Sequence, residues 1–108
     1  MRALSNRFVM AVVLLMLLDS GAAFSAGRPE EGKVIAQRWC AICHQVSPEQ
    51  TMTSADVPSF MMIAEMRATP SALAALEGFL ADPHPVMPDM SLTRQEISDL
   101  VAYIGSLK

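Results

Sequence analysis

The pattern of hydrophobic and polar positions is clearest near the C-terminus. Four apolar residues recur there at helical spacing: Ile97, Leu100, Val101 and Ile104. This spacing predicts a helix that buries one face. Thr93 and Glu96, at the start of the stretch, match a capping box, in which each side chain binds the backbone N–H of the other residue. We therefore expect a helix that begins directly after Thr93.

Three earlier stretches are also expected to be helical. The first covers residues 29–41, where an initial proline and two glutamates suit the N-terminal turn of a helix. The second covers residues 59–66. The third follows Thr69, a good capping residue, and has one apolar stripe: Leu73, Leu76 and Leu80. No stretch alternates with a period of two, so the prediction is an all-α fold.

Two long connections separate the expected helices. Residues 44–57 are polar and irregular, and residues 83–90 contain three prolines, which stiffen the backbone and forbid regular structure. A long loop in a small domain needs a functional reason, such as wrapping around a ligand. The loops therefore point to a bound group.

The N-terminal segment has the layout of a secretory signal peptide. Arg2 and Arg7 precede an apolar run over residues 8–18, and small residues follow before the charges at 28–33. The run is well short of the roughly 20 residues that a membrane-spanning helix needs. The last residue removed could be Ala23, Ser25 or Ala26, and we take Ala26 as the boundary. The alternative is an uncleaved N-terminal anchor. No cysteine lies near the cleavage zone, which excludes a lipid-modified N-terminus.

Removal of a signal peptide at residues 1–26 would leave a single domain, residues 27–108. A domain of 82 residues buries too little hydrophobic surface to be more than marginally stable by itself. Domains of this size often add a disulfide, a metal or a cofactor. Its 6 Lys+Arg and 10 Asp+Glu give a net charge of −4. We expect no nucleic-acid binding, because an acidic domain without a basic stripe is poorly suited to it.

The only two cysteines lie in "WCAICH", at Cys40 and Cys43, with His44 directly after them. A disulfide between them would close a tiny loop and stabilise little. A structural zinc site normally has four protein ligands, and His84 is the only other histidine. A thioredoxin-like dithiol expects a βαβ pattern, which is absent. The remaining interpretation is C-x-x-C-H, the attachment motif of a c-type haem.

The chemistry of that cofactor explains the spacing. One helical turn separates the thiols of Cys40 and Cys43 enough for each to add to one vinyl group of the haem. His44 is then held beneath the iron, where its imidazole is a natural axial ligand. We therefore predict one covalently attached haem c.

The sequence resembles the small, soluble, monohaem class I cytochromes c of bacteria over nearly all of residues 27–108. Four segments carry the resemblance: "GKVIAQRWCAICH" at 32–44, "VPSF" at 57–60, "PHPVMP" at 83–88 and "LTRQEISDLVAYIGSL" at 92–107. It implies a cytochrome c fold of about four helices with long loops around one haem.

The resemblance also implies that the first and last helices cross. In the family a glycine on the first helix permits the close approach, and Gly32, Leu100 and Tyr103 match the positions at this crossing. The sequence departs from the family at Ala36, where an aromatic residue is common. We expect Trp39 or another larger neighbour to fill the space.

A methionine on the far side of the haem is a further implication of the resemblance. Met87 is our candidate axial ligand because prolines stiffen its loop, with Met90 and His84 as alternatives. Three methionines are interpreted as core packing that can also touch the haem: Met61, Met62 and Met66. In the family a proline carbonyl orients the axial histidine, and Pro58 is our candidate, ahead of Pro48.

These features together imply an electron relay rather than an enzyme, because an iron with both axial positions filled cannot bind oxygen or peroxide without losing a ligand. We expect a monomeric periplasmic one-electron carrier. Its redox partners would be a dehydrogenase or cytochrome complex as donor and an oxidase or reductase as acceptor. It would contact the membrane only if the signal segment stayed uncleaved.

Two other functions stay open. One is a small haem peroxidase or gas-binding protein, which would need an open iron site. The other is an accessory haem domain that acts within one dedicated complex.

Overall fold

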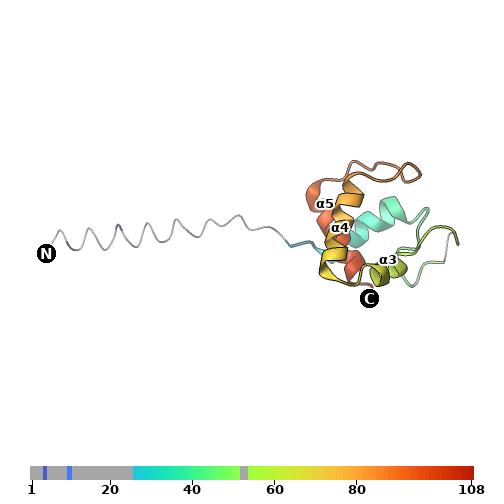
Figure 1. Cartoon of the computed structure of the whole chain (residues 1–108), viewed down its shortest axis with the longest axis horizontal. Coiled ribbons are helices and arrows are strands. Elements are labelled where there is room, and N and C mark those ends of the chain that lie inside the picture. Colours follow the sequence, from blue (N-terminus) through green and yellow to red (C-terminus); the bar gives the residue numbers. More distant parts are fainter. Residues whose placement is uncertain (1–3, 5–9, 11–25, 52–53) are drawn as a thin grey trace.

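A computed structural model of the chain describes residues 26–51 and 54–108, together with Leu4 and Met10. Its helical elements, shown in Figure 1, are α2 (Pro29–Ile35), η1 (Ala36–Cys40), α3 (Phe60–Met66), α4 (Pro70–Ala81) and α5 (Arg94–Gly105). The described residues contain no strand, so the predicted all-α fold is confirmed. Apart from Leu4, Met10 and Ala26, the predicted signal peptide at 1–26 lies outside the described residues.

Side-chain caps set where three of the helices begin. Ser59 Oγ accepts a hydrogen bond from the backbone N–H of Met62 in α3 at 3.1 Å, and Thr69 Oγ1 accepts from Ala72 in α4 at 3.2 Å. At the start of α5 the capping box is complete, since the Thr93 N–H donates to Glu96 at 2.7 Å and the Glu96 N–H donates to Thr93 at 3.2 Å. The helix starts predicted after Thr69 and Thr93 are confirmed.

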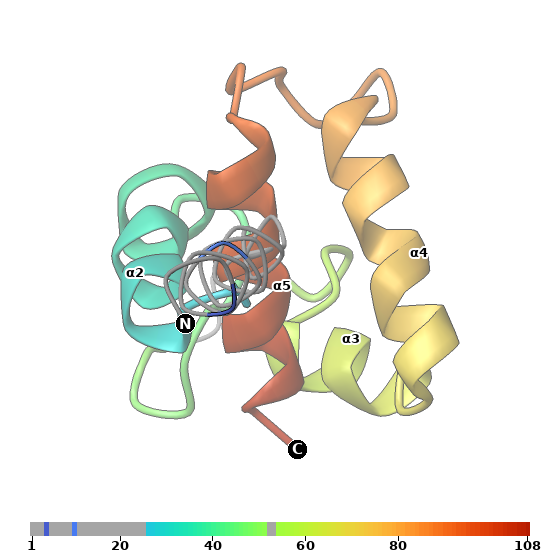
Figure 2. The same ribbon diagram turned by 90° about the vertical axis from the view of Figure 1, so that its left-hand side faces the viewer.

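The last helix forms the centre of the fold. Figure 2 shows α5 between α2 on one side and α4 on the other, with α3 near the C-terminal end of α5. The predicted apolar face of α5 is buried: Ile97, Leu100, Val101 and Ile104. Leu76 and Leu80 of α4 pack into the same hydrophobic cluster. Among the described helices, none combines the length and hydropathy needed to cross a membrane.

A glycine allows α2 and α5 to touch backbone to backbone. Gly32 is buried, and a Cβ atom at this position would lie 2.8 Å from the Cβ of Tyr103 and closer still to the backbone carbonyl of Asp99. Any larger residue would therefore force the helices apart. The predicted crossing at Gly32 and Tyr103 is confirmed.

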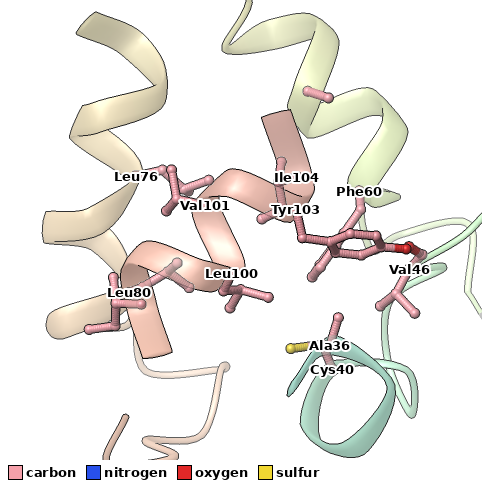
Figure 3. Packing of buried hydrophobic residues seen from close by; sticks show 12 residues of the cluster. Ala36, Cys40, Val46, Phe60, Leu76, Leu80, Leu100, Val101, Tyr103 and Ile104 are labelled. Carbon is pink, nitrogen blue, oxygen red and sulfur yellow. The ribbon is translucent and has the colours of Figure 1, made fainter. Parts of the chain in front are cut away.

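The space beside Ala36 is filled from α3 and α5. Ala36 is fully buried, whereas Trp39 is 50% exposed and lines a cavity. Figure 3 shows the ring of Tyr103 above Ala36, with Phe60 beside it. The Tyr103 hydroxyl donates to the Val46 carbonyl oxygen at 2.7 Å. The expectation that Trp39 fills the crossing is wrong, because aromatic rings distant in sequence occupy that space.

A buried carboxylate ties the start of the domain to α5. The Asp99 side chain is 2% exposed and accepts hydrogen bonds from the Arg28 backbone N–H at 2.8 Å, the Arg28 Nη2 at 2.9 Å and the Gln95 Nε2 at 2.8 Å. Burial alone would raise the pKa of Asp99, but the bonds from Arg28 and Gln95 outweigh it and the pKa is lowered. Asp99 is therefore ionised at neutral pH.

Candidate functional site

The two cysteines and the histidine lie on one compact turn at the end of the first helix. In η1 the helix widens to a π-turn, in which the Ala41 N–H donates to the Ala36 carbonyl at 3.0 Å. The chain then tightens, because the N–H groups of Cys43 and His44 both donate to the Cys40 carbonyl, at 3.1 and 2.8 Å. All three predicted residues, Cys40, Cys43 and His44, line one cavity.

The two thiols differ in their surroundings. Cys40 is 4% exposed, and burial raises its pKa to about 11. Cys43 is exposed. A redox-active dithiol uses a nucleophilic cysteine whose pKa is lowered, and burial of Cys40 works in the opposite direction. Cys40 is therefore unsuited to be the nucleophile of a thiol–disulfide exchange centre.

A zinc centre also lacks support. Across the described residues, no group of three or more His, Cys, Asp or Glu side chains is placed to hold a metal ion.

His44 is fixed by a carbonyl oxygen. Its Nδ1 lies 2.7 Å from the carbonyl oxygen of Pro58, and its ring packs 5.6 Å from that of Phe60, centroid to centroid. A carbonyl oxygen can only accept a hydrogen bond, so Nδ1 must carry the proton and donate it. The lone pair of Nε2 is then left for a metal ligand bond. Pro58, rather than Pro48, is the acceptor, as the sequence suggested.

Gln50 holds the loop after the cysteines closed, a role that no sequence pattern indicated. Its Nε2 donates to the carbonyl oxygens of Ala41 at 3.0 Å and His44 at 3.1 Å. Its Oε1 accepts from the Val46 N–H at 3.0 Å. One amide side chain therefore joins both ends of the cysteine–histidine turn to the loop that follows, which fixes the backbone around His44.

A cavity of about 520 Å³ opens beside His44. Its volume falls within the roughly 300–1,000 Å³ that is usual for pockets holding small molecules and cofactors. Helices α3 and α4 and the 83–90 loop provide most of its apolar wall: Ile63, Met66, Leu76, Phe79, Val86 and Pro88. A flat apolar macrocycle fits this lining, and the cysteine thiols and the histidine are placed at its edge.

The 83–90 loop brings the predicted methionine to the same cavity. Met87, Met90 and His84 all line it. Met87 is half-buried and packs against the hydrophobic core, which Met90 does not, and its N–H donates to the His84 carbonyl at 2.9 Å. The His84 ring is exposed and lies 5.4 Å from that of Phe79, centroid to centroid. These contacts favour Met87 among the three candidates.

The methionines of α3 depart in part from their predicted role in the core. Met61 is half-buried and packs against the hydrophobic cluster, as expected. Met62 and Met66 are 53% and 64% exposed, so neither is a core residue. Met66 lines the cavity, which is compatible with the expected contact between this helix and the haem. A short helix exposes part of every turn, and the sequence alone did not show which side faces outward.

Comparison with known proteins agrees with the geometry of this site. The chain matches the cytochrome c family over residues 29–108. It is 43% identical over 96 residues to the cytochrome c-552 of Bradyrhizobium diazoefficiens, and the match covers 89% of this chain and 90% of that relative. No solved structure gives a significant match. The chain therefore belongs to the cytochrome c family and is an all-α electron-transfer protein whose cofactor is a covalently bound c-type haem.

Proposed function

We propose that this protein is a periplasmic one-electron carrier whose haem is attached through Cys40 and Cys43 and ligated by His44 and Met87. One observation carries the proposal. The Nδ1 of His44 donates to the Pro58 carbonyl at 2.7 Å, beside a cavity that Met87 also lines. The histidine is thus oriented for a ligand on Nε2, and a thioether is available from a separate loop.

Attachment requires only groups that this turn provides. Each cysteine adds its sulfur to one carbon of a vinyl group and its proton to the other, so no atom is lost and no oxidant is needed. Cys40 and Cys43 are held one turn apart by the bond from the Cys43 N–H to the Cys40 carbonyl at 3.1 Å. Because both residues line the cavity, the thioethers would anchor one edge of the macrocycle there.

The protein groups around the iron would favour electron transfer over catalysis. The hydrogen bond from His44 to Pro58 orients the imidazole and increases its basicity. A neutral thioether favours ferrous iron and raises the reduction potential. With both axial positions occupied, the iron would be closed to oxygen and peroxide. This supports a carrier over the alternative of a small peroxidase or gas-binding protein.

The expected location and partners rest on sequence features. The basic start and short apolar run of residues 1–26 favour export to the periplasm and cleavage, which would leave residues 27–108 as a monomeric cytochrome c domain. The bacterial relative is named a cytochrome c-552, which is consistent with a small exported carrier. The net charge of −4 after cleavage suits redox partners with basic or neutral docking patches.

A pair of matched variants tests the ligand set. In Met87→Ala, the ferric protein should lose the weak near-infrared band of sulfur ligation, its reduction potential should fall, and the ferrous form should bind carbon monoxide. Met90→Ala is the control, because Met90 lines the same cavity from the same loop. It should leave all three properties nearly unchanged.

The opposite results would assign the ligand elsewhere. A loss of the band in Met90→Ala alone would make Met90 the ligand. An unchanged spectrum in both variants would point to His84. Carbon monoxide binding by the unmutated ferrous protein at neutral pH would contradict the closed iron site and favour the enzyme alternative.

A further inference from the structure

The side-chain amide of Gln50 is held in one orientation by the backbone around the attachment turn. Its Nε2 faces the carbonyl oxygens of Ala41 at 3.0 Å and His44 at 3.1 Å, and its Oε1 faces the Val46 N–H at 3.0 Å. The reverse orientation would place an oxygen against both carbonyls, so it is excluded. Both N–H donors of the amide are therefore used, and their acceptors lie in the turn that contains His44.

The neighbouring Gln45 ties Gln50 to the segment that faces His44. Its Nε2 donates to the Gln50 carbonyl oxygen at 2.8 Å, and its own carbonyl oxygen accepts from the Phe60 N–H at 2.9 Å. Gln45 directly follows His44, and Phe60 lies two residues after Pro58. These bonds therefore help to set the separation between the imidazole of His44 and the carbonyl oxygen of Pro58.

The other end of this network is anchored in the core. Val46 is buried, and its carbonyl oxygen accepts from the Tyr103 hydroxyl of α5 at 2.7 Å (Figure 3). The bond from the Val46 N–H thus holds the Gln50 amide to a residue that is fixed against the central helix. Gln50 in turn fixes the carbonyl of His44, and with it the backbone from which the imidazole projects.

The position of that imidazole affects the iron through the hydrogen bond to Pro58. A short bond from Nδ1–H makes Nε2 a stronger electron donor, which favours ferric iron and lowers the reduction potential. We propose that Gln50 is a positioning residue that keeps the His44–Pro58 bond short, at 2.7 Å, and thereby lowers the reduction potential of the haem. This inference rests on the proposed ligation of the iron by His44.

The test is Gln50→Leu, which removes the amide and keeps a side chain of similar volume. Exchange of the His44 Nδ1–H with deuterium oxide would be followed by proton NMR of the ferrous holoprotein. It should be about tenfold faster than in the wild type, the factor expected from the net loss of about one hydrogen bond. The reduction potential of the same holoprotein should rise, because the imidazole becomes a weaker donor.

The direction of the shift separates this effect from access of water to the iron. Loss of the amide could also admit water to the site, but water stabilises the more highly charged ferric haem and would lower the potential. A rise in potential together with faster exchange therefore identifies the histidine as the group that has changed.

Gln95→Leu is the matched control. Gln95 is also half-buried, and its Nε2 donates at 2.8 Å to Asp99, on α5. This variant should lose thermal stability, but its reduction potential and its Nδ1–H exchange should stay at the wild-type values. The comparison therefore distinguishes positioning of His44 from a general loosening of the fold.

Two results would overturn the proposal. One is coincidence of Gln50→Leu with Gln95→Leu in both exchange rate and potential, and the other is faster exchange in Gln50→Leu without a rise in potential. If Gln50→Leu yields no holoprotein, Gln45→Leu removes the bond to the Gln50 carbonyl oxygen and should shift both readouts in the same directions. Unchanged readouts in that variant would equally refute the role of Gln50.

Failure of the proposed function looks different, because it would be seen in the wild-type protein. If His44 did not ligate the iron, its Nδ1–H signal would not shift and broaden when the haem is oxidised from the ferrous to the ferric state.

Discussion

Substitution of Gly32 by alanine tests the helix crossing on which the fold depends. The added Cβ would lie 2.8 Å from the Tyr103 Cβ and would overlap the backbone carbonyl of Asp99. Carbon atoms pack at about 3.5–4.0 Å, so α2 and α5 would have to separate by about 1 Å. A side chain could rotate away from the added Cβ, but backbone atoms cannot. The two helices must therefore move apart.

The cost can be worked from this displacement. A gap of about 0.5–1 Å forfeits a quarter to a half of each dispersion contact, and overpacking of a tight site typically costs about 1–3 kcal/mol. Alanine recovers about 0.5–1 kcal/mol in a helix relative to glycine. The clash is with backbone, so we take the upper overpacking value of about 3 kcal/mol. Less the gain of about 1 kcal/mol from alanine, the free energy of unfolding should fall by about 2 kcal/mol. For a domain of this size the melting temperature should fall by about 8–16 °C.

Gly78→Ala provides the matched control, because Gly78 lies in α4 and a Cβ added there would meet no other part of the fold within 4 Å. This change should stabilise the holoprotein by about 0.5–1 kcal/mol. Both variants would be compared with the wild type by thermal denaturation followed by far-ultraviolet circular dichroism. A Gly32→Ala protein as stable as Gly78→Ala would refute the close approach of α2 and α5.

The buried acid and the attachment turn each give a further prediction. Asp99→Asn should destabilise the protein at neutral pH. The pKa of Asp99 is lower in the folded state than its unfolded value of about 3.9. The ionised side chain therefore adds to the free energy of unfolding above that value, and this contribution is lost as pH falls through the folded-state pKa. The denaturation midpoints of the variant and the wild type should therefore converge in acid. A difference between the two midpoints that did not change with pH would contradict the Arg28–Asp99 contact. Denatured protein should retain its haem through acid–acetone extraction, because Cys40 and Cys43 both bind it covalently; release of the haem would exclude those thioethers.

The sequence was most informative where structure depends on near neighbours. Thr93 and Glu96 cap α5 through bonds that span three residues, and such local contacts can be recognised from residue types alone. The C-x-x-C-H motif is equally local, since one turn of backbone holds its three side chains together. The predicted helices and the attachment motif therefore needed no knowledge of the tertiary fold.

Features that depend on distant partners could not be predicted in the same way. Nothing near Asp99 in sequence shows that Arg28 pairs with it, and a polar residue such as Gln50 fits any exposed loop. The position of Trp39 was mistaken because helical periodicity does not show which space a neighbouring helix leaves.

The contacts that α5 makes with much earlier parts of the chain have a consequence for how the protein folds. Arg28 meets Asp99 across 71 positions, and Tyr103 meets Val46 across 57. To form contacts between residues so far apart in sequence, a large loop must close. The chain therefore loses conformational entropy before these contacts stabilise it. Until α5 has docked, Cys40 has no buried environment and the cavity lacks the support of its central helix. The domain should therefore behave as one cooperative unit, in which loss of α5, or of the segment before α2 that carries Arg28, would also disrupt the haem site.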